Sequence, residues 1–273
     1  MENARGDKLQ RMADEQLASM KAQVYKDPRP PEYFDRFHQR VRANPPNWVY
    51  ELVRVVTVLY GLIFFRMRCI ASDSVPPSGR VILAPNHFSF MDHFFTGAFT
   101  RRRVNFMAKS QLFAKPMEWI YSPGGVFPVR RGHYDEDAFV TAQTILDREG
   151  AIVMYCEGGR SRSGRVGERA RPGIGRLALQ SGAPVVPIAI YGSQRVRNWK
   201  KLQFPKVLVQ YGEPLRFEQV EKPSREQQQA VSDEILGAIR ALYADLEQLG
   251  EKQVRRRVRA QRRGTAHPAG AQS

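Results

Sequence analysis

The chain has 273 residues, a length that fits one large α/β domain with extensions or two smaller folding units. Hydrophobic residues make up 42% and charged residues 26%, which excludes collagen-like, mostly disordered and polytopic membrane proteins. The net charge of +16 favours anionic partners such as nucleic acid or membrane lipid. Two cysteines are too few for a disulfide framework or a thiolate zinc cage, and they indicate a reducing compartment.

The first 70 residues are predicted to form a helical extension. Apolar side chains recur at three- and four-residue steps over residues 7–26 and 33–41, and a proline-rich break follows each segment. A third helix is expected over residues 48–67. Its uncharged stretch, residues 55–65, is shorter than the roughly 20 residues that span a bilayer. Two interpretations stay open for this helix, one as part of a buried core and one as a helix lying in the membrane interface.

From residue 80 onward, short β-branched apolar runs alternate with helical stretches, which predicts an α/β domain with a central mixed, largely parallel sheet flanked by helices. The predicted strands cover residues 81–83, 104–106, 126–127, 151–155, 184–190 and 207–211. A last helix is expected over about residues 225–249. The chain is therefore divided into a helical, membrane-associating extension (1–70), an α/β domain (71–250) and a basic, disordered tail (251–273).

A histidine and an aspartate, His87 and Asp92, follow the first of these predicted strands. Residues five apart lie about 140° apart on a continuous helix, so the two side chains can cooperate only across a turn. A loop through Ser89 and a helix opening near Asp92 would give the base and its orienting carboxylate. As an isolated pattern it is weak, since a capping aspartate beside a loop histidine explains it more simply. A metal site that adds His93 is disfavoured because zinc sites use more ligands.

Two further segments combine glycine with arginine after a strand. Residues 124–131 place Arg130 and Arg131 at the end of a short strand, where guanidinium groups suit bidentate phosphate binding. Residues 157–165 carry glycines and arginines that suit an anion. This segment lacks the ending of a P-loop, which disfavours nucleotide hydrolysis. Cys156 ends an apolar strand and is therefore an improbable nucleophile.

Four segments, taken together and in this order, resemble the glycerolipid acyltransferase family, specifically its bacterial 1-acylglycerol-3-phosphate acyltransferases. Its His-x4-Asp block is similar to residues 87–92, its Gly-x-Phe-Pro-Val-x-Arg block to residues 125–131, its Glu-Gly-Thr-Arg-Ser block to residues 157–161 and its Val-Pro-Ile block to residues 186–188. The resemblance runs from about residue 78 to 214. Gly159 stands where the family usually has threonine, so any hydroxyl contact made there is missing.

The resemblance implies transfer of a fatty acyl group from acyl-CoA or acyl carrier protein to the free hydroxyl of a lysophospholipid, typically lysophosphatidic acid, without a metal or bound cofactor. It implies that His87 deprotonates the hydroxyl and that Asp92 orients and stabilises the imidazolium. The residues implied to hold the acceptor are Arg131, Glu157, Gly158, Arg160 and Ser161, and those implied to line the apolar site are Val186, Pro187 and Ile188. Backbone N–H groups near Gly158 or Asn86 are candidate oxyanion donors.

A lipid acceptor implies a peripheral or monotopic enzyme. The N-terminus shows no secretory signal, so we expect the protein at the cytoplasmic face of the cell membrane. Residues 101–103 and the basic run 252–263 would attract an anionic membrane surface.

Three alternatives stay open. The first is an acyltransferase or transacylase for another lysophospholipid or a glycolipid. The second is a non-catalytic lipid-binding module on the same fold. The third is a basic nucleic-acid-binding protein, although the absence of a zinc-finger or RNA-recognition signature leaves no specific nucleic acid expected.

Overall fold

A computed structural model describes residues 27–130, 135–161, 163–196 and 204–265. The helix predicted over residues 7–26 and the site residue Arg131 lie outside these ranges, as does the end of the predicted tail from residue 266.

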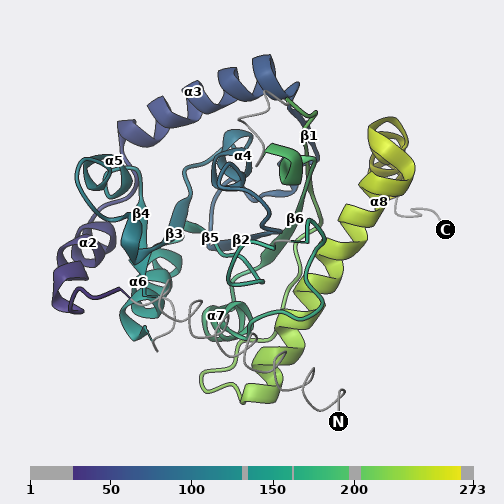
Figure 1. Ribbon diagram of the computed structural model, residues 1–273. Coiled ribbons are helices and arrows are strands. Elements are labelled where there is room, and N and C mark those ends of the chain that lie inside the picture. The colour runs from purple at the N-terminus through teal and green to yellow at the C-terminus, as the bar shows by residue number, and fades with distance from the viewer. Residues whose placement is uncertain (1–26, 131–134, 162, 197–203, 266–273) are drawn as a thin grey trace, which may run out of the picture.

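Among the described residues, seven strands form one sheet, in the order β1-β7-β6-β2-β5-β3-β4 (Figure 1). The strands are β1 (Arg68–Ile70), β2 (Val81–Pro85), β3 (Asn105–Lys109), β4 (Val126–Val129), β5 (Ala151–Val153), β6 (Val185–Tyr191) and β7 (Leu208–Tyr211). All neighbouring strands run parallel except β6 and β7, which pair antiparallel. The prediction of a mixed, largely parallel sheet is confirmed.

Helices cover both faces of this sheet. They are α2 (Glu32–Ala43), α3 (Trp48–Phe65), α4 (Asp92–Ala98), α5 (Glu118–Tyr121), α6 (Glu136–Asp147), α7 (Gly173–Ser181) and α8 (Arg225–Thr265), with 3-10 turns η1 (Ser72–Ser74) and η2 (Ser110–Leu112). Successive side chains of a strand point to opposite faces. In β2, Ile82 packs with α6, α7 and α8, whereas Leu83 packs with α3 and α4. The central strand β2 is therefore buried on both sides, as a parallel sheet with helices on both faces requires.

Helix α3 lies across the body of the protein with one face against it. Its buried residues are Tyr50, Thr57, Gly61 and Phe65, which recur at steps of seven and four and so share one face. Most large apolar side chains on the rest of the helix are exposed. By length and composition, Trp48–Phe65 is also long and apolar enough to cross a membrane, with only 22% of the segment buried. The sequence-based expectation that this segment is too short to span a bilayer considered only the uncharged residues 55–65, whereas the whole helix has 18 residues.

The C-terminal helix differs from the sequence-based expectation. Residues 251–265, predicted as the start of a disordered tail, continue α8 beyond a kink at Gly250, where φ is 70°. Val254 is buried against the β1–β7 edge of the sheet, and Arg262 forms an ion pair with Asp73 of η1. The part of α8 beyond the kink therefore packs on the face of the sheet near β1 and β7.

Candidate active site

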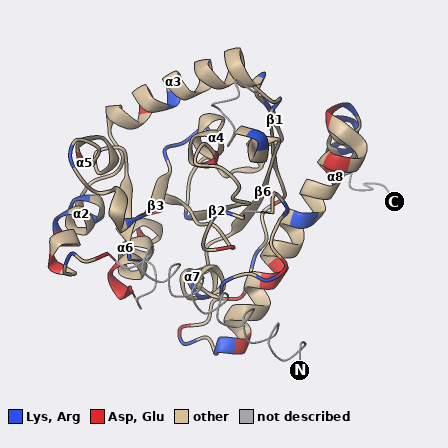
Figure 2. Ribbon diagram, in the orientation of Figure 1, with Lys and Arg blue, Asp and Glu red and all other residues tan. Residues whose placement is uncertain are grey.

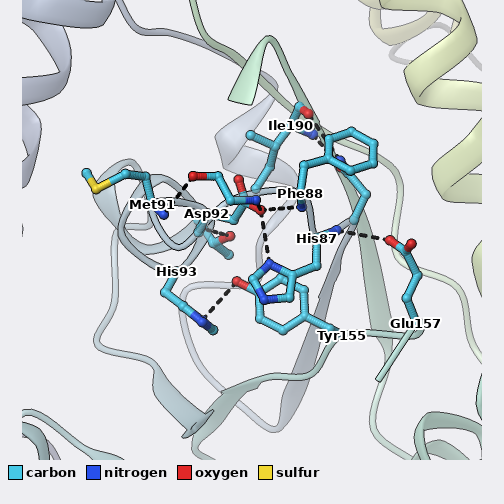
Figure 3. A network of polar contacts seen from close by, with 11 residues as sticks. His87, Phe88, Met91, Asp92, His93, Tyr155, Glu157 and Ile190 are labelled. Carbon is cyan, nitrogen blue, oxygen red and sulfur yellow. Dashed lines mark hydrogen bonds and ion pairs between the residues drawn. The ribbon is translucent and has the colours of Figure 1, made fainter. Parts of the chain in front are cut away.

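The candidate site lies where β2 and β5 end. These strands are parallel neighbours, with Leu83 opposite Val153, so their carboxyl ends meet at one edge of the sheet. His87 follows β2 directly, and Tyr155 and Glu157 follow β5 (Figure 3). Such an edge, outside the carboxyl ends of parallel strands, is where open α/β sheets bind ligands.

One carboxylate oxygen organises the loop after β2. Oδ2 of Asp92 accepts hydrogen bonds from the backbone N–H groups of Phe88 and Ser89, both at 2.6 Å. The same oxygen lies 3.0 Å from Nδ1 of His87, and the side chains of both members of the pair are nearly fully buried. Helix α4 begins at Asp92, after a turn in which Ser89 Oγ accepts from Met91 N–H. The contact across a turn expected from the sequence is present.

The backbone on both sides of His87 is fixed by further hydrogen bonds. Asn86 is fully buried, and its amide group donates to the carbonyl of Ile190 and accepts from its N–H, at 3.1 and 2.7 Å. The carbonyl of His87 accepts from Ser161 N–H at 2.8 Å. The Asn86 side chain thus continues the hydrogen bonding between β2 and β6 beyond the end of β2. The backbone that carries the His87 imidazole is therefore held in place.

Glu157 holds the same loop from the β5 side. Oε1 accepts from the backbone N–H of His87 at 3.0 Å, and Oε2 accepts from Gly167 N–H at 3.2 Å. Burial raises the pKa of this carboxyl above its usual value, against the lowering effect of these two N–H donors. In this structure Glu157 therefore ties two loops together, a role that the sequence did not suggest.

Two residues outside the predicted site complete it: Tyr155, which the sequence gave no reason to choose, and His93, which was considered only as a metal ligand. The Tyr155 ring stacks on the His87 imidazole, with centroids 4.1 Å apart and an interplanar angle of 27°. The Tyr155 hydroxyl lies 3.0 Å from Nδ1 of His93, which is next to Asp92 at the start of α4 (Figure 3).

An apolar cavity of about 280 Å³ adjoins this cluster. Helices α3, α4 and α5 and strand β3 line it, through Val53, Thr57, His93, Phe94, Gly97 and Phe106 among others. His93 connects the cavity to the polar cluster, because its ring lies 5.1 Å from that of His87. Phe90, Met117 and Ile120 line the cavity and are also exposed, so they border its opening. The arrangement offers a base beside a space for an apolar chain.

The remaining site predictions have different outcomes. Gly158 adopts φ +64° beside Arg171, Arg160 is exposed, and Ser161 Oγ bonds to its own loop through Arg165 O. These residues therefore lie next to the His87 loop, and their proposed contact with an acceptor stays a prediction.

The Val-Pro-Ile segment, by contrast, is corrected. Val186, Pro187 and Ile188 are buried in strand β6, and none of them lines the apolar cavity. Val186 and Ile188 pack into the core between the sheet and helices α3 and α4, so their role in this structure is to pack the core.

The backbone groups considered as oxyanion donors are already engaged. Asn86 N–H donates to Ile188 O, and Gly158 N–H donates to Tyr155 O. Burial raises the pKa of the Cys156 thiol, which disfavours the thiolate form that a nucleophile needs. Among the described residues, no group of three or more His, Cys, Asp or Glu side chains is arranged to hold a metal ion.

His87 and Asp92 form a buried pair at the carboxyl edge of a mixed α/β sheet, and comparisons with known proteins indicate the class of protein to which this arrangement belongs. Residues 66–191 match the family model described as Acyltransferase. The chain is 26% identical over 137 residues to the chloroplastic 1-acyl-sn-glycerol-3-phosphate acyltransferase BAT2 of Brassica napus; the match covers 49% of this chain and 39% of that protein.

The fold is also similar to the crystal structure of PlsC, the 1-acyl-sn-glycerophosphate (LPA) acyltransferase of Thermotoga maritima. The TM-score is 0.55 at 22% sequence identity, over 71% of this chain and 81% of that one. Residues 66–191 of this chain are thus similar to the Acyltransferase family, and the fold is similar to that of PlsC.

The two possible roles of Glu157 can be separated kinetically. Glu157→Gln replaces one of the two carboxylate oxygens, each of which accepts a hydrogen bond, by an NH₂ group. This NH₂ group then faces a backbone N–H. If Glu157 holds the loop, we expect kcat to fall about tenfold with KM for the acyl acceptor unchanged. A 1 Å displacement of a catalytic group costs about 10²-fold, and losing one of two hydrogen bonds should displace His87 by less than that. Steady-state kinetics measure both constants. A raised acceptor KM at unchanged kcat would instead assign Glu157 to acceptor binding.

Proposed function

We propose that this protein transfers a fatty acyl group from acyl-CoA or acyl carrier protein to the free hydroxyl of lysophosphatidic acid, making phosphatidic acid for phospholipid synthesis. The observation that carries the proposal is the buried His87–Asp92 pair, 3.0 Å apart, beside an apolar cavity. A base next to a chain-sized apolar space suits a reaction between a hydroxyl and a fatty thioester.

In the proposed mechanism, Nδ1 of His87 stays bonded to Asp92 and Nε2 takes the proton of the acceptor hydroxyl. The hydroxyl oxygen attacks the thioester carbonyl carbon, and the carbon–sulfur bond breaks as the tetrahedral intermediate collapses. The imidazolium then protonates the leaving thiolate, so an ester and a free thiol are formed and the base is restored. Asp92 stabilises the transient positive charge, a contribution that grows in a buried site.

The apolar cavity is the proposed site of the acyl chain. Its lining is almost entirely apolar, and His93 brings its inner part next to the catalytic pair. The bordering residues Phe90, Met117 and Ile120 are exposed, so a lipid chain can enter from outside. Gly97 of α4 leaves room inside, because a Cβ there would lie 3.2 Å from the Phe106 ring and 3.3 Å from the Tyr50 hydroxyl.

The proposed location is a membrane surface, at the cytoplasmic face, with the protein peripheral or monotopic. The outward face of α3 carries exposed apolar side chains, including Val56 at 57%, Leu59 at 54% and Ile63 at 69% exposure. Trp119 of α5, 65% exposed, lies on a helix that lines the same cavity. Exposed apolar surface around a cavity opening suits an enzyme whose acceptor resides in a bilayer.

Arginines on α8 supply the proposed attraction to anionic lipid. Counting 100° per residue, Arg256, Arg259 and Arg263 lie about 140–200° around the helix from the buried Val254. All three are exposed. Figure 2 shows Lys and Arg in blue on the C-terminal part of α8. The 101–103 run contributes less than expected, because Arg102 donates to backbone carbonyls and Arg103 pairs with Glu51.

His87→Ala tests the proposed chemistry. We expect acceptor-dependent release of free thiol from a long-chain acyl-CoA to fall by about 10²-fold or more, because the general base is lost. Thermal unfolding checks that the variant is folded. Near wild-type release by His87→Ala would refute the mechanism, whereas a wild-type protein active only with another lysolipid or a carrier-protein donor would change the substrate and keep the chemistry.

Gly97→Ala tests the cavity as the acyl-chain site. The added methyl group narrows the cavity, so we expect kcat/KM for long-chain donors to fall about tenfold relative to short-chain donors. Gly237→Ala is the matched control, since Gly237 is an exposed glycine of α8 with nothing within 4 Å of an added Cβ. An unchanged chain-length profile in folded Gly97→Ala protein would place the acyl chain elsewhere.

Two triple variants test the membrane surface by co-sedimentation with vesicles. Replacing Val56, Leu59 and Ile63 by Ser should weaken binding both to phosphatidylcholine vesicles and to vesicles that also contain phosphatidylglycerol. Replacing the three α8 arginines by Gln should weaken only binding to the anionic vesicles, by about 1 kcal/mol per charge. Wild-type binding by both variants would contradict the proposed orientation.

A further inference from the structure

The His87 imidazole is held on its face as well as on its edge. Asp92 contacts the ring edge at Nδ1, and the Tyr155 ring covers one face at 4.1 Å (Figure 3). Tyr155 is itself held by its backbone, whose carbonyl accepts from Gly158 N–H, and by its hydroxyl, 3.0 Å from Nδ1 of His93. The contacts made by Tyr155 are additional to the contact between His87 and Asp92.

A single hydrogen bond does not fix the plane of a histidine ring. With Nδ1 of His87 tied to Asp92, the ring can still turn about the line joining its Cβ to that bond, and this rotation swings Nε2 through space. A flat ring stacked at 4.1 Å opposes the rotation, because turning the imidazole drives its edge into the phenol. A proton transfer needs its two heavy atoms within about 3 Å, so this rotation controls the rate.

We propose that Tyr155 is a positioning residue that fixes the ring plane of His87, and that His93 holds Tyr155 in place. This inference rests on the proposed function. Asp92 and His93 are consecutive at the start of α4, so one helical turn carries both the group that holds His87 and the group that holds Tyr155. Asp92 contacts His87, His87 stacks on Tyr155, and the Tyr155 hydroxyl contacts His93, which follows Asp92 in the chain. A displacement of one of these side chains is therefore opposed by its neighbours.

The geometry of His93 supports this assignment. Its ring is edge-on to both partners, with centroids 5.0 Å from Tyr155 at 89° and 5.1 Å from His87 at 62°. Edge-to-face contacts of this kind are favourable for aromatic pairs. His93 also lines the apolar cavity, so the positioning contact lies at the border between the cavity and the base.

The stack also favours the charged state that His87 reaches during the reaction. An imidazolium above the face of a neutral phenol is stabilised by the ring quadrupole. Burial holds the pKa of Tyr155 well above its usual value, so the phenol stays neutral and keeps its proton. The other titratable groups near His87 are Asp92 and His93 from α4 and Glu157 from the β5 loop. Removing the phenol ring therefore removes one of the groups that favour the imidazolium.

Three variants separate the ring from its hydroxyl. Tyr155→Leu removes the ring, whereas Tyr155→Phe keeps the ring and removes the hydroxyl. His93→Phe keeps an aromatic ring on the cavity wall but removes Nδ1. Activity is measured as acceptor-dependent thiol release, with kcat, both KM values and the pH dependence of kcat/KM determined for each folded variant.

We expect Tyr155→Leu to lower kcat about 10²-fold with both KM values little changed, and to move the acid limb of kcat/KM to lower pH. Tyr155→Phe should restore most of this loss, leaving a decrease of about fivefold, the effect of one neutral hydrogen bond. His93→Phe should lower kcat by about the same factor as Tyr155→Phe. The double variant Tyr155→Phe/His93→Phe should lower kcat no further than either single variant. Wild-type kcat in Tyr155→Leu, or additive losses in the double variant, would overturn the proposal.

An NMR measurement tests the stack without any substrate. The imidazole protons of His87, assigned by their loss in His87→Gln, should be shifted upfield by the Tyr155 ring and should move downfield in Tyr155→Leu but not in Tyr155→Phe. Unchanged shifts in the leucine variant would overturn the stacking.

The proposed function and the proposed role of Tyr155 are contradicted by different results. Absence of thiol release by the wild type counts against the function, whereas an active wild type with an equally active Tyr155→Leu counts against the positioning role.

Discussion

The Oδ2 atom of Asp92 is the point on which the site depends. It receives two backbone N–H groups and the ring nitrogen of His87, so one buried oxygen shapes the loop after β2, starts α4 and orients the imidazole. These three contacts satisfy Oδ2, whereas the buried Oδ1 of the same carboxylate has no hydrogen-bond partner among the described residues. A buried charge without any partners would destabilise the fold. Glu157 and Asn86 then fix the backbone of this loop to β5 and β6. The loop geometry is thus set by buried polar contacts.

Helix α4 connects the His87–Asp92 pair to the apolar cavity. Helix α4 begins at Asp92, carries His93 between the polar cluster and the cavity, and ends beside α3, whose outward face is apolar and exposed. The cavity therefore lies between the catalytic pair and the proposed membrane-facing surface. An acyl thioester arriving through the opening near Phe90 would place its apolar chain in the cavity and its carbonyl near His87. In the proposed function, the short helix α4 therefore both positions the base, through Asp92, and lines the cavity for the acyl chain.

The sequence predicted what depends on local patterns and missed what depends on tertiary contact. Six of the seven strands were expected, because β-branched runs mark them. Strand β1 was not expected, because its three residues lie at the end of the predicted helical extension 1–70, just after the helix predicted over 48–67. The basic tail was expected to be disordered because of its charge, yet Val254 anchors it. The spacing of His87 and Asp92 was weak as an isolated pattern, and their predicted role came from the four-segment resemblance. Tyr155 carries no spacing signal, because it follows β5, which is far in sequence from His87 and His93. His93 is adjacent to Asp92 in sequence, but its contact with Tyr155 depends on the tertiary fold.

The most direct test of the central claim is acyl transfer by Asp92→Asn. Asparagine can present one oxygen to the same N–H donors, so the loop can persist, but the charge that stabilises the His87 imidazolium is gone. We predict acceptor-dependent thiol release reduced by at least about 10²-fold in a folded protein. Turnover close to that of the wild type would contradict the account, because Asp92 would then shape the loop without assisting the base.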